Sequence, residues 1–257
     1  MDMPPSVDIR LMNLSAQALA LCFVMLGLGV ALTWMVRHPV FDIRGITVTG
    51  DVTHNNAVTL RANIASRLSG TFLTVDLAQA REVFESVPWV RKAVVRREFP
   101  NRLQVILEEH KPVAFWGDDG ASTLINQHGE VFEANVDDIE QDLPRLNGPI
   151  HQAPQILAMY RTLEPVFEAV DLPLTDLEMS NRGSWRATLD TGAVIELGRG
   201  HEEEIVTRSQ RFLRTATQVT SRYGRRLNAL ESADLRYEDG YAIRLRGVTT
   251  GTDMKKR

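Results

Sequence analysis

The most strongly apolar part of the chain is Leu14–Val36, which carries no charge and has Gln17 as its most polar residue. About 20 helical residues are enough to cross the hydrocarbon core of a bilayer. Trp34 lies near one end of the stretch, where an indole ring favours the membrane interface. The pattern therefore predicts one transmembrane helix over residues 14–36, preceded by a short tail of residues 1–13.

Two other interpretations fit this stretch less well. A cleaved signal peptide has a shorter apolar core of about 7–15 residues and a small-residue exit, and Gly29–Ala31 is a poor exit because large apolar residues follow it. A buried core helix is disfavoured by all-round apolarity at this length. Charge leaves the orientation open, since Arg10 marks one side and Arg37 and Arg44 mark the other.

Residues 41–110 show the strand–helix–helix–strand–strand pattern of a small α/β unit. Alternation in the first strand stops at the turn pair Gly50–Asp51. Asp76 is placed to cap the second helix, and Pro88 ends it. Pro100–Asn101 supplies the turn of the closing hairpin. The predicted elements are a strand at 43–48, helices at 55–68 and 77–87, and a hairpin over 90–107.

Residues 111–248 predict a mixed, mainly antiparallel β domain with two helices, which places the whole chain in the α+β class. The first helix, 153–170, is expected to kink or break near Pro165. The second covers 202–224. Residues 249–257 are polar and predict a flexible tail.

The last patterned stretch, Ala233–Gly247, has two alternating runs on either side of "EDG" and predicts a β-hairpin. Its second run places Arg244 and Arg246 on one face and apolar residues on the other. A strand at the end of a domain is often an edge strand, which offers unpaired backbone groups. We therefore expect a sheet edge that carries arginines.

Composition narrows the classes of function. The 257 residues have a formal net charge of −4, which argues against a dedicated nucleic-acid binder. Cys22 is the single cysteine, so no intrachain disulfide is possible and the chain is safe in an oxidising compartment.

The most site-like motif is Gly198-x-Gly200, which follows a predicted strand and opens a helix as a phosphate-binding loop would. Three carboxylates, Glu202–Glu204, occupy the first turn of that helix and would repel a phosphate. His201 beside them suggests no metal, because adjacent helical residues point in different directions. We expect a tight turn and an acid-stabilised helix start, with no metal and no cofactor.

A second candidate is the basic stretch that contains Arg91, Lys92, Arg96, Arg97 and Arg102. On a hairpin these charges divide between two faces, so solvated charges are favoured over a nucleic-acid surface, and contact with a protein partner stays open. The sequence shows no catalytic signature such as GxSxG or HExxH. We therefore expect no enzyme; an envelope enzyme with an unrecognised site is the remaining alternative.

Taken in order, these segments resemble the FtsQ/DivIB family of bacterial cell-division proteins. The phrases that carry the resemblance run from Phe41 to Arg246 and are "IRGITVTG", "VPWVRKAVVRREFPNRLQVILEEHKPVAFW", "LINQHGEVF", "LPRLNGP", "SWRATLDTG", "IELGRG" and "ADLRYEDGYAIRLR". The resemblance implies a POTRA domain at 41–110 followed by the β domain.

The resemblance also implies a location and a role. It implies a single-pass protein of the bacterial inner membrane, with residues 1–13 cytoplasmic and the bulk periplasmic, found at the division septum. It implies a divisome scaffold that binds the FtsB and FtsL proteins, links early and late division proteins, and helps to bring in septal peptidoglycan synthesis. A POTRA-containing envelope transport or assembly module is the alternative, although only one POTRA unit is present.

The family's contact positions map onto two hairpins of this sequence and onto Arg182, which precedes Ser184–Trp185 and corresponds to a second contact arginine. The first is the terminal hairpin, where an FtsB segment adds to the last strand; Asp239 stands where serine is usual in the family. The second is the POTRA hairpin, which resembles a recruitment surface. The implied partner-binding residues are Arg236, Tyr237, Asp239, Gly240, Tyr241, Arg244 and Arg182, and the implied recruitment residues are Val90, Arg91, Lys92 and Arg96.

Physical reasoning supports the first of these sites but leaves an alternative. A partner strand can complete the ladder of an open edge, and arginines there deter self-pairing and select an acidic partner. Tyr237 and Tyr241 are of the type that anchors interfaces. Alternatively, both tyrosines are half-buried core residues, and Arg244 and Arg246 are merely solvated.

Overall fold

The computed structural model describes residues 7–36, 38–54, 60, 64, 67–68, 70–118, 120, 122–139, 141–222, 224–237 and 240–248. The chain divides into two compact units, Met1–Glu109 and His110–Arg257. Each unit contains its own sheet and its own buried core.

The chain begins with the apolar helix that the sequence predicts. Helix α1 covers Val7–Val36, and its Met12–Met35 stretch has a mean hydropathy of 2.2 with none of it buried. Among the described residues it is the one helix long and apolar enough to cross a membrane. An apolar helix that packs against no other part of the described protein is expected where lipid surrounds it.

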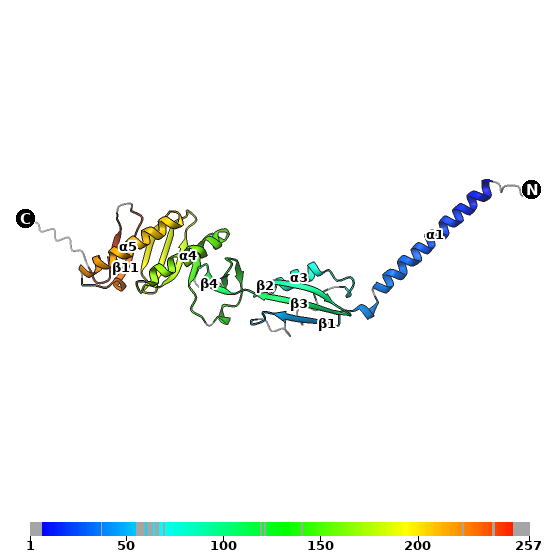
Figure 1. Ribbon diagram of the computed structural model, residues 1–257, viewed down its shortest axis with the longest axis horizontal. Coiled ribbons are helices and arrows are strands. Elements are labelled where there is room, and N and C mark those ends of the chain that lie inside the picture. Colours follow the sequence, from blue (N-terminus) through cyan, green and yellow to red (C-terminus); the bar gives the residue numbers. More distant parts are fainter. Residues whose placement is uncertain are drawn as a thin grey trace, which may run out of the picture. The chain divides into compact units, whose positions relative to one another are not determined.

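The rest of the first unit is a three-stranded sheet with the order β1-β3-β2 (Figure 1). Strand β3 lies in the middle, parallel to β1 and antiparallel to β2. The elements after α1 are the 3-10 helix η1 (Pro39–Phe41), β1 (Gly45–Gly50), α3 (Leu77–Glu85), β2 (Val90–Glu98) and β3 (Arg102–Glu109).

Local chemistry explains the elements of this unit. Asp76 caps α3, because its Oδ1 accepts hydrogen bonds from the Ala78 amide at 2.8 Å and the Gln79 amide at 3.2 Å. Phe84 and Val105 are fully buried and join the helix to the sheet. Most of the predicted helix at 55–68 lies outside the described residues. Its Leu60 and Ile64 are helical and belong to the same core.

The second unit is a nine-stranded sheet with the order β12-β11-β10-β9-β8-β7-β4-β5-β6. Most neighbouring strands are antiparallel, but β4 with β7, β7 with β8, and β10 with β11 are parallel. Its strands are β4 (Pro112–Trp116), β5 (Thr123–Asn126), β6 (Val131–Glu133), β7 (Arg145–Asn147), β8 (Leu174–Met179), β9 (Trp185–Leu189), β10 (Val194–Gly198), β11 (Leu230–Asp234) and β12 (Ala242–Leu245).

Two long helices, α4 (Ala153–Glu168) and α5 (Glu202–Arg222), lie over this sheet (Figure 1). In β9 the alternate residues Trp185, Ala187 and Leu189 are buried, whereas Arg186 between them is exposed. Such alternation shows that the sheet has one covered face and one solvent face. Three short 3-10 helices complete the unit: η2 (Val136–Asp138), η3 (Ile150–Gln152) and η4 (Leu227–Ala229).

Of the two alternatives expected at Pro165, a kink or a break, the break is wrong. Helix α4 continues through Pro165 to Glu168. Only three helical residues follow the proline, and one of them, Phe167, is fully buried. Packing of that side chain holds the last turn in place despite the missing backbone donor.

The closing hairpin is present with different bounds from those predicted. β11 ends at Asp234, so Arg236 and Tyr237 lie in the connecting loop and not on a strand. β12 ends at Leu245, and Arg246 therefore lies past the strand, where its guanidinium donates to the carbonyl of Thr191. The expectation of an edge strand is confirmed, because β12 terminates the sheet order and no described strand lies beyond it.

Candidate partner-binding edge

Within the described part of the chain, strand β12 has one partner strand. It pairs with β11 in antiparallel register, with Asp234 opposite Ala242, Ala233 opposite Ile243 and Ser232 opposite Arg244. In an antiparallel ladder, successive residues direct their backbone groups to alternate sides. About half of the N–H and C=O groups of β12 therefore point away from β11. This row of groups can receive a further strand.

The two faces of β12 have different surroundings. Leu245 is buried, and Ile243 packs against the core of the second unit. Arg244 is on the solvent face, where its side chain is 73% exposed and lies 3.7 Å from a carboxylate oxygen of Glu231. Exposed ion pairs of this kind contribute little to stability. The guanidinium of Arg244 therefore costs little to redirect toward a partner.

Arg236, at the start of the loop after β11, is held by a neighbouring carboxylate. Its Nε and Nη2 donate to the two oxygens of Asp234 at 2.8 and 2.6 Å, and its backbone N–H donates to Oδ1 at 3.1 Å. These hydrogen bonds lower the pKa of Asp234 and raise the pKa of Arg236. The fork-to-fork geometry orients the guanidinium although its side chain is 58% exposed.

The two tyrosines of this loop differ in their surroundings. The ring of Tyr241 lies 5.1 Å from that of Phe212 in an edge-to-face arrangement, and its hydroxyl donates to Thr215 Oγ1 at 2.9 Å. Tyr241 is half-buried and packs against the core. Tyr237 is 61% exposed. Tyr241 is thus part of the support of the loop, and Tyr237 is available to a partner.

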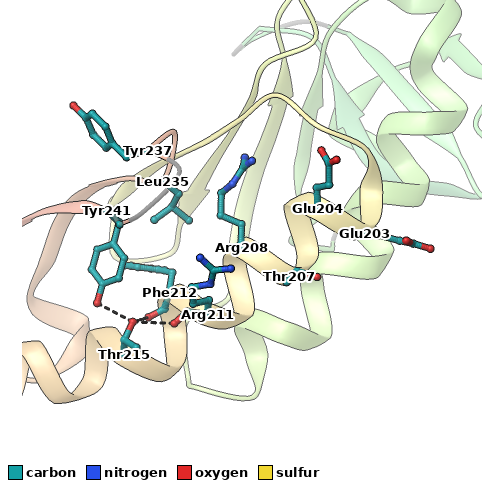
Figure 2. A pocket seen from close by; sticks show the side chains of 11 residues that line it. Glu203, Glu204, Thr207, Arg208, Arg211, Phe212, Thr215, Leu235, Tyr237 and Tyr241 are labelled. Carbon is teal, nitrogen blue, oxygen red and sulfur yellow. Dashed lines mark hydrogen bonds between the residues drawn. The ribbon is translucent and has the colours of Figure 1, made fainter.

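A groove of about 670 Å³ separates the loop from α5. Figure 2 shows Leu235, Tyr237 and Tyr241 on the loop side, and Arg208, Phe212 and Thr215 on the helix side. Its lining combines aromatic and aliphatic side chains with charged ones. Such a groove fits an apolar side chain of a partner chain that also carries polar groups.

A second hollow of about 450 Å³ lies at the same end of the sheet and collects four arginines. Arg208 of α5 is fixed by donating to the carbonyls of Leu197 and Arg199. Within the described part of the chain, neither Arg182 nor Arg199 forms a side-chain ion pair. The lining residues are Ser180, Arg182, Ser184, Gly198, Arg199, Arg208 and Arg236. The hollow therefore favours a carboxylate-bearing ligand.

Gly198 makes the approach of these arginines possible. Its φ is +83°, a conformation that L side chains rarely adopt, and a Cβ there would lie 3.0 Å from Arg236 Cγ and 3.2 Å from Arg208 Nη1. The glycine that suggested a phosphate loop therefore has a different role. It gives space where strand β10, helix α5 and the 235–241 loop meet.

Sequence reasoning did not identify Arg199 and Arg208 as site residues. They come from the β10–α5 turn and from α5, whereas Arg182 comes from the β8–β9 turn and Arg236 from the loop after β11. Because the four arginines come from three segments that are far apart in sequence, no local spacing could have shown that they converge. Asp239 lies outside the described residues, and Gly240 is exposed on the groove rim.

The implied recruitment residues lie on β2 of the first unit. Arg91 donates from Nη1 to Glu108 at 2.7 Å, and Lys92 and Arg96 are exposed. Val90 is 4% exposed and belongs to the core. Of this set, Lys92 and Arg96 are therefore the residues that present exposed side chains to solvent.

The phosphate-loop and metal interpretations find no support in the described residues. Glu204 turns back to accept a hydrogen bond from the His201 amide at 3.2 Å, which occupies the helix start with a carboxylate. No group of three or more described His, Cys, Asp or Glu residues is placed to hold a metal ion.

Comparison with known proteins adds two kinds of match. Residues 41–110 match the family model of the FtsQ-type POTRA domain, and residues 114–236 match that of the FtsQ/DivIB cell-division protein C-terminal region. A Burkholderia pseudomallei protein named "Cell division protein FtsQ" is 38% identical over 250 residues, which are 97% of this chain and 98% of that protein. A protein of the same name from Thiomonas arsenitoxydans is 38% identical over 94% of this chain and 89% of that protein.

The contrast between the two tyrosines gives a stability prediction. We expect Tyr241→Ala to lower the free energy of unfolding by about 2 kcal/mol, because it removes a half-buried ring and its hydrogen bond. Tyr237→Ala should change it by less than about 0.5 kcal/mol, as an exposed side chain does. Urea unfolding followed by circular dichroism measures both. Equal losses would show that Tyr237 is also a core residue.

Proposed function

The chain belongs to the FtsQ/DivIB family of cell-division proteins, and from that premise we propose that it is a non-enzymatic scaffold of the divisome. The scaffold sits in the bacterial inner membrane by one span, with its N-terminus in the cytoplasm, its bulk in the periplasm, and its place of action at the division septum. Its partners are FtsB-like and FtsL-like single-pass proteins, and it links early division proteins to septal peptidoglycan synthesis.

The observation that carries this proposal is the open edge at β12. The nine-stranded sheet ends in a strand of four residues beside which no further described strand lies, and such an edge offers backbone hydrogen bonds to an incoming segment. We propose that a partner adds one strand beside β12. Backbone pairing would supply the attachment, and side chains near the strand would supply the specificity.

The arginine hollow indicates the chemistry of that partner. The turns that line it and the 235–241 loop all lie at the end of the sheet where β10 and β11 finish. Neighbouring strands are about 4.8 Å apart, so the hollow is roughly 10–15 Å from the β12 edge. A segment that pairs with β12 and continues past the loop would place acidic side chains there. Arg182 and Arg236 would bind them, and Tyr237 and Gly240 would contact the adjoining backbone.

The POTRA hairpin provides a second proposed contact. Arg91, Lys92 and Arg96 are displayed along β2, and we propose that they help to recruit another divisome protein. The match of residues 114–236 to the FtsQ/DivIB C-terminal model favours this scaffold over the alternative of an envelope transport module.

Partner binding can be tested without disturbing the fold. We expect Tyr237→Ala and Arg182→Glu each to weaken binding of the periplasmic segment of the FtsB-like partner by about 30-fold, because a central aromatic or arginine contact is worth about 2 kcal/mol. Isothermal titration calorimetry measures the dissociation constants. Arg214→Glu, on the exposed side of α5, is the matched charge-reversal control and should bind normally.

Two further results would decide the outcome. The melting temperatures of the two binding variants should equal that of the parent chain. Binding should also weaken as salt is added, since exposed arginines act through screened charge. Unchanged affinity in both variants would refute the site.

Orientation in the membrane has its own test. Alkaline phosphatase fused after residue 257 folds only in an oxidising compartment, and we expect it to be active because the bulk of the chain is proposed to be periplasmic. A cytoplasm-dependent reporter fused at the same position should be silent. The reverse pair of results would overturn the proposed topology.

A further inference from the structure

One end of the first unit gathers the segments that follow the transmembrane helix. Strand β1 starts at Gly45, and β3 runs parallel to it from Arg102, so the β2–β3 turn lies at the same end of the sheet. Arg44 donates its backbone N–H to Asn101 at 2.9 Å, and Phe72 donates its own to Phe41 at 2.7 Å. We call this end, formed by residues 39–44, 70–75 and 98–102, the basal end.

The basal end exposes apolar side chains from three separate segments. Phe99, at the tip of the hairpin, is 86% exposed, which is the largest value among the large apolar residues that the structure describes. Val40 of η1 is 59% exposed, and Leu73 of the 70–75 segment is 44% exposed. Exposed large apolar side chains that are gathered at one end of a unit mark a site of contact with a partner or with lipid.

The covalent chain keeps this end close to the bilayer. Val40 is four residues and Arg44 eight residues beyond Val36, so at most about 14 and 28 Å of extended chain separate them from the end of α1. Turns shorten that reach, because His38 donates to the Met35 carbonyl at 3.2 Å and Phe41 donates to the His38 carbonyl at 2.9 Å. This limit on distance holds for every orientation of the first unit relative to α1.

The hairpin tip is rigidly joined to the rest of the basal end. Arg97 donates from Nε to the carbonyl of Phe72 and from Nη2 to that of Val75, both at 2.7 Å. Because these bonds hold β2 against the 70–75 segment, Phe99 and Leu73 belong to two segments that are joined directly to each other. The arrangement of these two segments therefore does not depend on contact with lipid.

The charges near this surface suit the headgroup region. Arg44 and Arg102 are exposed and are accompanied by the carboxylates of Asp42 and Glu98. Headgroups can pair with both signs of charge, and anionic lipid attracts the arginines. The balance of charge is close to neutral, so apolar contact supplies most of the attraction.

We propose that the basal end is a membrane-docking surface, in which Phe99, with Leu73 and Val40, inserts into the headgroup and upper acyl region of the leaflet at the C-terminal end of α1. The occupant is the lipid surface that α1 already spans. A protein partner would have to reach this surface within a few residues of the bilayer. Docking gives the first unit a second attachment besides α1 and limits its tilt on the membrane.

Depth-dependent quenching in the full chain tests this proposal. The chain is placed in lipid nanodiscs, with Cys22→Ala as the background, and a nitrobenzoxadiazole fluorophore is attached at Glu98→Cys beside the intact Phe99. Phosphatidylcholine with a spin label near the headgroup is the quencher. The matched control is the same fluorophore at Lys92→Cys, an exposed position on the same strand about 20 Å away.

We expect stronger quenching at position 98 than at position 92, in discs of phosphatidylcholine alone and in discs with phosphatidylglycerol. Adding Phe99→Ser should shift the ratio of docked to free protein by about tenfold toward the free state, which is the loss expected from one aromatic side chain. Phe99→Leu keeps a large apolar side chain and should retain docking. Circular dichroism melting checks that each variant folds.

Equal quenching at the two positions in both lipids would overturn the proposal. That result is also the one expected if a protein, and not lipid, covers this end in the cell. Quenching that survives Phe99→Ser, or that occurs only with phosphatidylglycerol, would contradict insertion of Phe99 and assign the contact to the arginines instead.

Discussion

The organisation of the second unit depends on one constraint: a β-sheet satisfies its backbone groups only where another strand lies beside it. The nine-stranded sheet meets this condition along its interior and leaves its two end strands, β12 and β6, with a single neighbour each among the residues that the structure describes. Helices α4 and α5 cover one face of the sheet but do not pair with its edge. The short length of β12 and the charge of Arg244 are of the kind that limits self-association of such an edge.

The surroundings of the edge determine what can use it. Gly198 lets β10, α5 and the 235–241 loop come together, and this brings Arg208 and Arg236 beside one hollow. Asp234 orients Arg236 through two short hydrogen bonds, and Thr215 and Phe212 hold Tyr241. The loop is thereby supported from both sides while Tyr237 stays exposed. Residues that hold the loop in place thus position the residues that are exposed to a partner.

Much of the fold could be predicted because its determinants are local. Asp76 caps its helix and Pro100–Asn101 turns its hairpin through interactions among near neighbours. The sequence left open whether α4 breaks at Pro165 or continues through it, because continuation depends on the burial of Phe167 by distant residues.

The candidate site was only partly predictable for the same reason. The edge strand follows from its position at the end of the domain. The arginine hollow depends on the parallel pairing of β10 with β11, which brings three distant segments to one end of the sheet. No spacing in the sequence encodes that pairing. The division of roles between Tyr237 and Tyr241 likewise requires the position of α5.

The central claim is that a partner pairs with the free backbone of β12. Amide hydrogen exchange of residues 242–245, with and without the periplasmic segment of the FtsB-like partner, tests it most directly. The account predicts slower exchange at alternate residues of β12, namely those whose N–H groups point away from β11. Unchanged exchange along β12 while the partner is bound would contradict it.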